Sequence, residues 1–303
     1  MEVLTVEQLK QLGVQFSVAI GFFDGVHLGH QLVIKKAIKK AAEFSQKSLV
    51  ITFDRSPKIA MGIAQDDGYL TPTKQKLNYF EKLGVDYTLV LPFEQELIKL
   101  SADDFITQYL TVINTKFVTV GFDFQFGNRG SGTTTTLMNN TAFKTEVIEA
   151  VEVEHQKVAT TKIKSLLRAG NLEAAAQMLG RYFIVGGTVV AGKKLGRTIG
   201  FPTANVAIGS EFYQGLNGVY VTRFSIKDQT YYAMTNIGIN PTVNDAGHTT
   251  VETHIFDFSK DIYGEYVKIE FLTKIREEKK FDSIDELVMQ LKDDMNFAKT
   301  WIK

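Results

Sequence analysis

The chain contains no cysteine, which excludes disulfide bonds, a thiolate nucleophile and zinc sites built from cysteine. Its 34 basic and 34 acidic residues balance, so no net charge draws it to nucleic acid or to an anionic membrane. No apolar run approaches the roughly 18 residues of a membrane span. The N-terminus lacks the basic-then-apolar pattern of a secretory signal. We therefore expect a cytoplasmic protein without nucleic-acid or membrane partners.

A length of 303 residues predicts about two domains. Strands expected at 16–20, 48–53, 87–91 and 117–120 alternate with helices at 32–44, 73–83 and 101–110. This alternation predicts an α/β domain with a Rossmann-like parallel sheet. A helix from residue 160, interrupted at 170–171, ends at Gly180; frequent strands and glycine-rich turns then predict an antiparallel β-barrel, with a last helix at 284–291. We place the domains at 1–181 and 182–303.

One stretch stands out, AIGFFDGVHLGH at residues 19–30, because a glycine-rich turn leads to two histidines and then to a helical pattern. The first N–H groups of a helix have no partner within it and carry partial positive charge, so such a turn forms an anion site. His27 and His30 share a helix face and could both donate to phosphate oxygens. The alternative is a tight turn with solvated or capping histidines. We favour the phosphate site because turn and helix occur together.

Two further turns, at residues 52–58 and 121–132, also follow predicted strands. Ligands bind at the carboxyl ends of parallel strands, so all three turns should converge on one edge of the sheet. Phe122, Phe124 and Phe126 alternate in the last of these turns. They could form the wall of a site for a planar ligand, or they could simply fill a core.

A second candidate phosphate site begins the helix at Thr160, where the sequence TTKIK combines hydroxyl groups and lysines. The alternative is an ordinary N-cap with a solvated basic face. By contrast, GTVVAGKK at 187–194 is not a P-loop. Lys194 replaces the Ser or Thr that would hold magnesium, and the stretch lies in β-rich sequence.

The second half offers oxygen ligands and a carboxylate. In GRTIGFPTAN, residues 196–205, a glycine-arginine loop precedes Thr203 and Asn205, whose oxygens are of the kind that Mg²⁺ accepts beside nucleotide phosphates. The alternative is a turn capped by these two side chains. Alternation along VETHIFDF places Glu252 opposite the face of Val251 and Thr253. A carboxylate pointing into the barrel mouth could act as a general base toward a hydroxyl, and a solvated strand face is the alternative.

Together these motifs resemble the bifunctional bacterial riboflavin kinase/FAD synthetase family over essentially the whole chain. Residues 21–30 resemble its nucleotidyltransferase motif, 121–127 its second loop and 160–164 its third. Residues 196–205 match its kinase motif, and 251–254, 261–264 and 276–281 follow in the expected order. The resemblance implies that the barrel phosphorylates riboflavin to FMN with ATP and Mg²⁺. It also implies that the N-terminal domain transfers AMP from a second ATP to FMN, giving FAD and pyrophosphate.

The resemblance implies individual roles as well. Glu252 would deprotonate the ribityl hydroxyl, Thr203 and Asn205 would hold Mg²⁺, and His27 and His30 would neutralise the α- and β-phosphates as pyrophosphate leaves. The partners are then small-molecule substrates, and we expect a monomer or a weak homo-oligomer. The residues implied in ATP binding are Gly21, Phe22, Phe23, Asp24, Gly25, Thr160, Thr161, Lys164, Gly192, Lys193, Gly196 and Arg197, and those implied in flavin binding are Phe53, Asp54, Asp123, Phe124, Phe126, Arg276 and Phe281.

The N-terminal half departs from the family pattern at three places. The family's second loop often carries Gly-Asp after its basic residues, and here the pair is Gly132-Thr133. The family's x-Pro-His-Pro is Asp-Arg-Ser-Pro at 54–57, and its Ser-Ser-Thr-Arg-Ile-Arg is Ala-Thr-Thr-Lys-Ile-Lys at 159–164. Lysine keeps the charge of arginine but loses its bidentate fork. Three hypotheses follow: an enzyme with both activities, a riboflavin kinase whose adenylyltransferase domain is weakened or altered in specificity, or a flavin-binding regulator without turnover.

Overall fold

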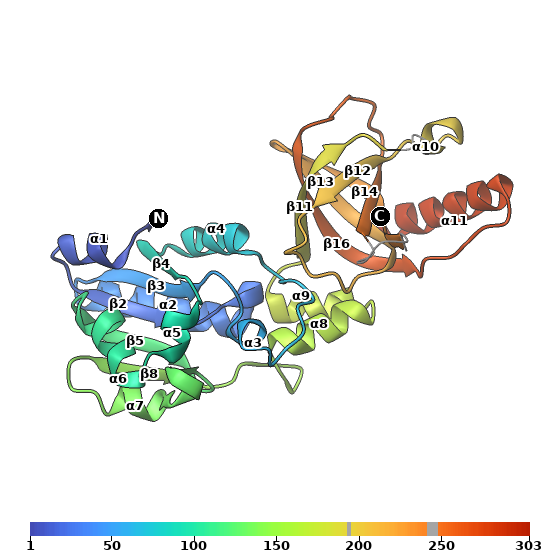
Figure 1. Ribbon diagram of the computed structural model, residues 1–303. Coiled ribbons are helices and arrows are strands. Elements are labelled where there is room, and N and C mark those ends of the chain that lie inside the picture. Colours follow the sequence, from blue (N-terminus) through green and yellow to red (C-terminus); the bar gives the residue numbers. More distant parts are fainter. Residues whose placement is uncertain (193–194, 241–247) are drawn as a thin grey trace. The chain divides into compact units, whose positions relative to one another are not determined.

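The computed structural model describes residues 1–192, 195–240 and 248–303 (Figure 1). These residues form two compact units. Unit 1 comprises Met1–Asp66 and Thr71–Thr160, and unit 2 comprises Asp67–Leu70 and Thr161–Lys303. The two helices between 160 and 179 therefore group with the second unit, except for Thr160 itself. The domain boundary that we predicted at residue 181 stays a prediction.

Unit 1 is built on a six-stranded parallel sheet in the order β1-β4-β3-β2-β5-β8, which confirms the α/β fold predicted from the sequence. Apolar side chains alternate between its two faces, so that Ala19 and Val50 point to one side and Val18 and Leu49 to the other. Both faces are therefore buried, as expected for strands rich in Val, Ile and Leu. The strands are β1 Glu2–Val3, β2 Phe16–Ile20, β3 Lys47–Phe53, β4 Tyr87–Leu91, β5 Thr115–Gly121 and β8 Lys144–Ile148.

Helices cover each face of this sheet, which gives unit 1 three layers. The α2 side chains Val33 and Ile34 and the α4 side chain Phe80 pack on the Ala19 face, whereas Leu9 of α1 and Phe105 of α6 pack on the opposite face. The helices are α1 Val6–Gln11, η1 Asp24–Val26, α2 Leu28–Glu43, α3 Pro57–Ala60, α4 Thr73–Leu83, α5 Gln95–Lys99, α6 Ala102–Ile106, η2 Thr107–Thr111, η3 Asn128–Gly130 and α7 Thr134–Met138, with short strands β6 Gln125–Phe126, β7 Gly132–Thr133, β9 Glu152–Val153 and β10 Gln156–Lys157.

Unit 2 is a closed barrel in the order β11-β12-β15-β14-β13-β16, and each of its strand pairs is antiparallel, as predicted. A chain of hydroxyl groups crosses three strands in its buried layer: Thr222 pairs with Thr235 at 2.8 Å, and Thr235 with Thr253 at 3.0 Å. The elements are α8 Thr160–Arg168, α9 Leu172–Leu179, β11 Phe183–Val190, α10 Leu195–Thr198, β12 Ala204–Ile208, β13 Gly218–Ile226, β14 Gln229–Asn240, β15 His248–Ile255, β16 Tyr266–Arg276 and α11 Ile284–Ile302.

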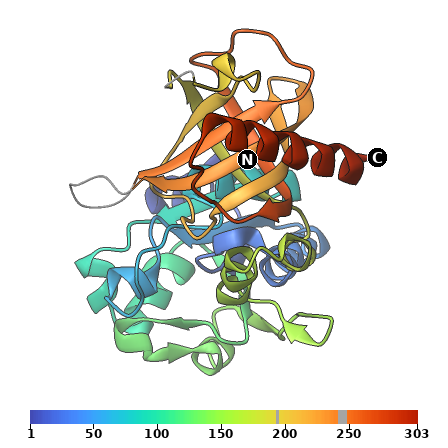
Figure 2. The ribbon, with the colours of Figure 1, turned by 90° about the vertical axis from the view of Figure 1, so that its right-hand side faces the viewer.

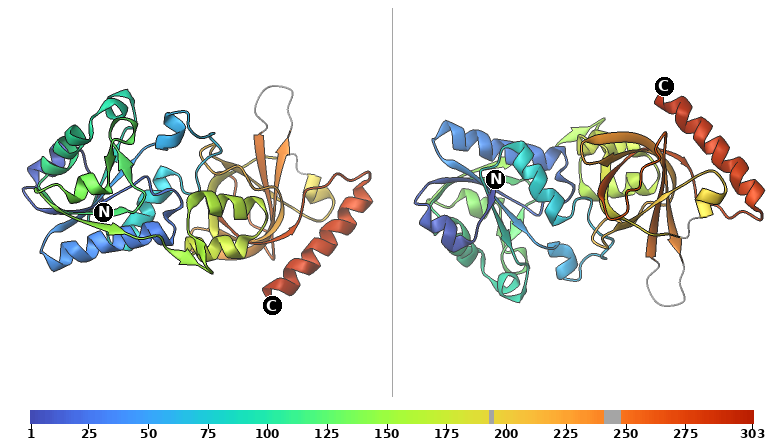
Figure 3. Two further views of the ribbon diagram at one scale, coloured as in Figure 1. Left: turned by 90° about the horizontal axis from the view of Figure 1, so that it is seen from below. Right: turned by 90° about the horizontal axis from the view of Figure 1, so that it is seen from above.

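The last helix, α11, is longer than predicted and lies along the outside of the barrel (Figures 2 and 3). Its Ala298 is fully buried against an apolar cluster that includes Val221, Met234 and Leu272. The helix predicted from the sequence ended at residue 291 because the polar residues 292–293 interrupt the apolar pattern. These residues are exposed, since only one stripe of the helix is apolar. Among the helices of the described residues, none has both the length and the apolar character needed to cross a membrane.

Candidate active sites

The three unusual turns of unit 1 meet at one edge of the sheet, as predicted. They follow β2, β3 and β5, and β2 lies between the other two in a parallel arrangement. The carboxyl ends of neighbouring parallel strands share an edge, where ligands of such sheets bind.

The two histidines of the first turn lie against each other at the N-terminus of α2. Their rings stack with 3.5 Å between centroids, and His27 is the N-cap residue, whose Nδ1 accepts a hydrogen bond from the backbone N–H of His30 at 3.3 Å. His27 is 6% exposed, so it is a buried cap and not a solvated one. The capping role and a role at an anion site are compatible, since both place the ring at the positive end of the helix.

The backbone of this turn requires glycine at two points. Gly25 has φ +83°, and a Cβ on Gly21 would come within 2.7 Å of the Phe23 ring. Phe23 itself adopts φ 57°, and its ring packs edge-on against His30 and against Phe80 of α4. The aromatic side chain thus anchors the strained turn in the core and holds the His30 ring in place.

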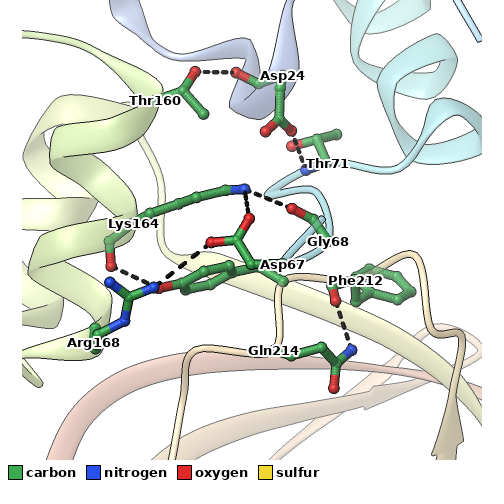
Figure 4. Close-up of polar contacts among 10 residues, drawn as sticks. Asp24, Asp67, Gly68, Thr71, Thr160, Lys164, Arg168, Phe212 and Gln214 are labelled. Carbon is green, nitrogen blue, oxygen red and sulfur yellow. Dashed lines mark hydrogen bonds and ion pairs between the residues drawn. The ribbon is translucent and has the colours of Figure 1, made fainter. Parts of the chain in front are cut away.

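Asp24 ties this turn to two distant segments of unit 1 (Figure 4). Its Oδ1 accepts a hydrogen bond from the Thr71 N–H at 3.0 Å, and its carbonyl oxygen accepts one from Thr160 Oγ1 at 3.0 Å. Both partners were far from Asp24 in the sequence. The Thr160 hydroxyl that we predicted to bind phosphate therefore contacts the backbone of the first motif.

The residues predicted to bind flavin in unit 1 divide into buried and accessible groups. Phe53 and Phe126 are each 6% exposed and belong to the core, so Phe126 follows the core-filling alternative. Phe124 is half-buried and stacks on Phe126, whereas Asp123 is exposed, with Lys157 Nζ at 3.7 Å. The carboxylate of Asp54 accepts a hydrogen bond from the Phe93 N–H at 2.9 Å, which links the ends of β3 and β4.

Lys164, predicted to bind ATP, is engaged within unit 2 (Figure 4). Its Nζ lies 2.5 Å from Asp67 Oδ1 and donates to the Gly68 carbonyl at 2.6 Å, and Arg168 approaches the other Asp67 oxygen at 3.6 Å. The Asp67–Leu70 segment itself adds to the barrel unit through the Tyr69 N–H, which donates to the Glu211 carbonyl at 2.7 Å. The ammonium group of Lys164, to which the resemblance assigns phosphate binding, is thus paired with the carboxylate of Asp67.

In unit 2, residues 196–205 form a tight loop into β12. The Phe201 N–H donates to the Gly196 carbonyl at 2.8 Å, Gly200 has φ +80°, and a Cβ on Gly196 would overlap the Phe201 carbonyl. These glycines bring the loop back on itself just before Thr203 and Asn205. A Cβ on Gly192 would likewise overlap the Asn205 side chain. Lys193 lies outside the described residues.

Glu252 does not point into the barrel, which corrects the expected position at its mouth. Val251 and Thr253 face the buried interior, and Glu252 lies exposed on the outer face. There it stands directly opposite Asn205 on β12 and Asn236 on β14. Side chains opposed in this way have Cβ atoms about 4.5–5.5 Å apart. The carboxylate therefore lies beside the amide that we predicted to bind metal.

Glu252 lines an outer pocket of ≈ 200 Å³, shared with Thr203, Arg276, Phe281 and Leu291. Aromatic, aliphatic and guanidinium surfaces of this kind suit a planar ring, and Glu252 and Thr203 supply polar groups. Both C-terminal residues predicted to bind flavin, Arg276 and Phe281, are thus in the same pocket as the predicted base.

A second, larger pocket of ≈ 450 Å³ adjoins it, and Thr203 lines both. Arg197 and Tyr263 form part of its wall, and an Arg197 guanidinium nitrogen donates to the Tyr263 hydroxyl at 3.2 Å. Residues Ser259, Lys260 and Asp261 add further polar atoms. The two pockets can therefore hold two ligands whose ends meet near Thr203.

Oxygen donors in and beside this junction fit Mg²⁺, since Thr203 lines both pockets and Asn205 stands opposite Glu252. Thr203, Asn205 and Glu252 offer a hydroxyl, an amide carbonyl and a carboxylate, and Mg²⁺ binds few protein ligands beside water and substrate phosphate. Within the described ranges, no cluster of three or more His, Cys, Asp or Glu side chains could hold a metal ion by itself. The donor set accordingly suits a metal that arrives with a nucleotide.

Comparisons with known proteins identify the family. A model described as FAD synthetase matches residues 10–162, and one described as riboflavin kinase matches residues 179–302. A bifunctional riboflavin kinase/FMN adenylyltransferase of Listeria monocytogenes is 37% identical over 279 residues, 91% of this chain and 89% of that protein. The chain belongs to this family.

Two further relatives extend over nearly all of the chain. The bifunctional riboflavin kinase/FMN adenylyltransferase of Bacillus subtilis is 34% identical over 295 residues, which cover 96% of this chain and 93% of that protein. A crystal structure described as a macrolide-efflux protein from Streptococcus pneumoniae has a TM-score of 0.88 at 34% identity and covers 99% of each chain. The two-unit architecture of this bifunctional family member is thus found in a solved structure.

Sequence reasoning missed two charged residues that support these family sites. Asp294 on α11 is buried and binds Arg276 through both carboxylate oxygens, at 3.0 Å from Nε to each. Lys76 on α4 is 1% exposed and donates to backbone carbonyls in unit 1. Each lies four residues from a buried apolar residue of the same helix, Ala298 and Phe80, and this spacing was the available signal.

Proposed function

We propose that the chain makes both flavin coenzymes: unit 2 transfers the γ-phosphoryl group of ATP to riboflavin, and unit 1 transfers AMP from ATP to FMN with release of pyrophosphate. Two observations support this beyond the family. Glu252 lies opposite Asn205 in a pocket shared with Arg276, and the stacked histidines cap the helix that follows the β2 turn.

In the kinase reaction, the flavin ring lies in the smaller pocket against Phe281 and Arg276, and ATP lies in the larger one beside Arg197. The ribityl hydroxyl reaches the junction at Thr203. Glu252 orients that hydroxyl and accepts its proton as the oxygen attacks the γ-phosphorus and the bond to the β-phosphate oxygen breaks. Mg²⁺, when bound, neutralises phosphate charge, and Thr203 and Asn205 would hold it.

In the adenylyl transfer, an FMN phosphate oxygen attacks the α-phosphorus of ATP, and the bond from that phosphorus to the pyrophosphate oxygen breaks. The N–H groups at the start of α2 and the ring nitrogens of His27 and His30 stabilise the growing negative charge. Gly21 and Gly25 permit the turn that brings these groups together. Phe22, Phe23 and Asp24 form the rest of that turn, with Thr160 bound to the Asp24 backbone.

One observation favours a weakened adenylyltransferase as the second candidate. Lys164 pairs with Asp67, and the side chain is only 15% exposed. The charge assigned to phosphate is thus partly neutralised from within the chain. The kinase half carries no comparable contact at Glu252, Thr203 or Asn205 among the described residues.

The test is an assay of the full chain with riboflavin, ATP and Mg²⁺, followed by chromatographic separation of the flavins. Formation of FMN and FAD supports both activities. FMN alone supports the weakened alternative, and tight flavin binding without product would refute both.

Sedimentation of the same preparation tests our inference that the chain is a monomer or a weak homo-oligomer. Localisation of the tagged chain by cell fractionation tests our inference that it is cytoplasmic.

A further inference from the structure

A buried lysine joins two of the turns at the edge of the unit 1 sheet. Lys76 Nζ donates to the Phe22 carbonyl at 2.8 Å and to the Phe53 carbonyl at 3.3 Å. The same nitrogen lies 4.2 Å from the centroid of the Phe22 ring. With its side chain 1% exposed, Lys76 is among the largest fully buried side chains of the described chain. Backbone carbonyls and an aromatic face thus replace water around the ammonium.

The two carbonyls belong to the segments that carry the proposed adenylyl-transfer site. Phe22 follows β2 and precedes η1, and Phe53 ends β3, directly before Asp54. The Phe22 carbonyl also accepts a hydrogen bond from Thr52 Oγ1 at 3.0 Å. One ammonium therefore fixes the start of the histidine turn against the end of the neighbouring strand.

We propose that Lys76 is a positioning residue for adenylyl transfer: its ammonium holds the turn after β2 in register with the end of β3, and it supplies a positive charge beneath the anionic substrates. This inference rests on the proposed function of unit 1. A misplaced histidine turn would be costly, because errors of about 1 Å in the geometry of a reacting group can cost 10²-fold in rate.

Two opposing effects, burial and nearby carboxylates, set the pKa of Lys76 and hence its charge. Burial lowers the pKa of Lys76 from its ordinary 10.5 to about 8, while the carboxylates of Asp24 on η1 and Asp54 after β3 oppose that effect. His27 and His30 are the other titratable groups of the turn. Because the pKa of Lys76 is lowered to about 8, its ammonium should lose its proton as the pH rises through that value.

The experiment measures FAD formation from supplied FMN and ATP as a function of pH in the full chain. In the natural protein, kcat/KM should fall about tenfold for each pH unit above about 8. Lys76→Met should lower kcat/KM at pH 7 by at least about tenfold and should lack this break. Lys76→Arg should retain part of the activity, and its profile should stay flat past pH 9, since a guanidinium does not titrate there.

Lys74→Met is the matched control, because Lys74 lies exposed on the same helix. It should behave as the natural protein, and riboflavin phosphorylation should stay unchanged in all variants. A break near pH 8 that persists in Lys76→Met, or full activity of that variant at pH 7, would overturn the proposal. If Lys76→Met does not fold, a break at the same pH in Lys76→Arg has the same consequence.

A second measurement does not depend on turnover. Hydrogen exchange followed by mass spectrometry should show faster exchange at residues 21–30 in Lys76→Met than in Lys74→Met, with the barrel unchanged. Equal exchange in the two variants would overturn the positioning role. A natural protein that makes no FAD, but shows this exchange difference, would refute the proposed function of unit 1 and with it a role of Lys76 in adenylyl transfer, while still showing that Lys76 holds the turn after β2 in place.

Discussion

Replacing Asp294 by leucine should lower the stability of the barrel unit and weaken riboflavin binding in its pocket, and the two effects can be measured separately. The side chain of Asp294 is 1% exposed. Its two carboxylate oxygens share the single Nε–H of Arg276, each at 3.0 Å from Nε, and a terminal guanidinium nitrogen lies 2.8 Å from Oδ2. Gln290, one turn earlier on α11, donates to the same carboxylate at 2.9 Å. The network connects α11 to the end of β16, where Arg276 lines the pocket.

The expected loss in the free energy of unfolding depends on the contacts that Arg276 keeps in the variant. Breaking a fully buried ion pair by removing one partner costs about 3–5 kcal/mol, because a charge stays buried and unpaired. The Arg276 side chain is 19% exposed and keeps its bond to the Glu277 carbonyl at 3.0 Å. We therefore expect a loss of about 2 kcal/mol in the free energy of unfolding. Asp294→Asn, which keeps an acceptor, should lose about half of that.

The double variant Asp294→Leu with Arg276→Leu should recover most of the stability, since replacement of a buried pair by apolar residues is often neutral. It should not recover flavin affinity, because the guanidinium that lines the pocket is gone. Asp294→Leu alone should raise the KM for riboflavin more than it changes kcat, since Arg276 would lose its fixed orientation without leaving the site.

The assay for stability is urea unfolding followed by the fluorescence of Trp301, the single tryptophan of the chain, which lies on α11. It therefore reports the barrel unit, and two units need not unfold as one transition. Riboflavin phosphorylation gives the KM. An Asp294→Leu variant with natural stability and natural KM would refute the reasoning. So would a double variant less stable than the single one.

Four further outcomes are expected. Glu252→Ala should lower FMN formation by about 10²- to 10⁴-fold and leave FAD synthesis from supplied FMN unchanged, as flavin chromatography would show. His27→Ala with His30→Ala should do the reverse; loss of both activities in either folded variant would contradict one reaction per unit. Asp67→Asn should lower the KM for ATP in FAD synthesis by about twofold or more if the Asp67 carboxylate competes with phosphate for Lys164. An unchanged KM would show that the Lys164–Asp67 ion pair does not affect ATP binding. In urea titrations, the stability of the natural protein relative to Lys76→Met should rise by about 3 kcal/mol between pH 8 and 10.5, because the unfolded chain binds the extra proton in that interval; a flat difference would show that the lysine pKa is not lowered.

The local sequence was enough to predict most elements and their order. Strand 16–20 and helix 73–83 have the predicted bounds, because turn residues and apolar periodicity act over a few neighbours. The helix predicted from residue 32 begins at Leu28, since the His27 cap and a short 3₁₀ turn extend it. A cap depends on side-chain geometry that a periodic pattern does not report.

The sequence by itself determined the chemistry available to this protein: a glycine-rich turn with two histidines at a helix start, a loop with hydroxyl and amide oxygens, and one carboxylate on an alternating strand. Only the tertiary structure decided which of these groups are accessible and what they contact. It placed Glu252 on the outer face of the barrel beside Asn205, paired Lys164 with Asp67, and buried Lys76 beneath the histidine turn. The reason is physical, since burial and ion pairing depend on segments far apart in the chain, and those long-range contacts set both the position and the charge of a side chain.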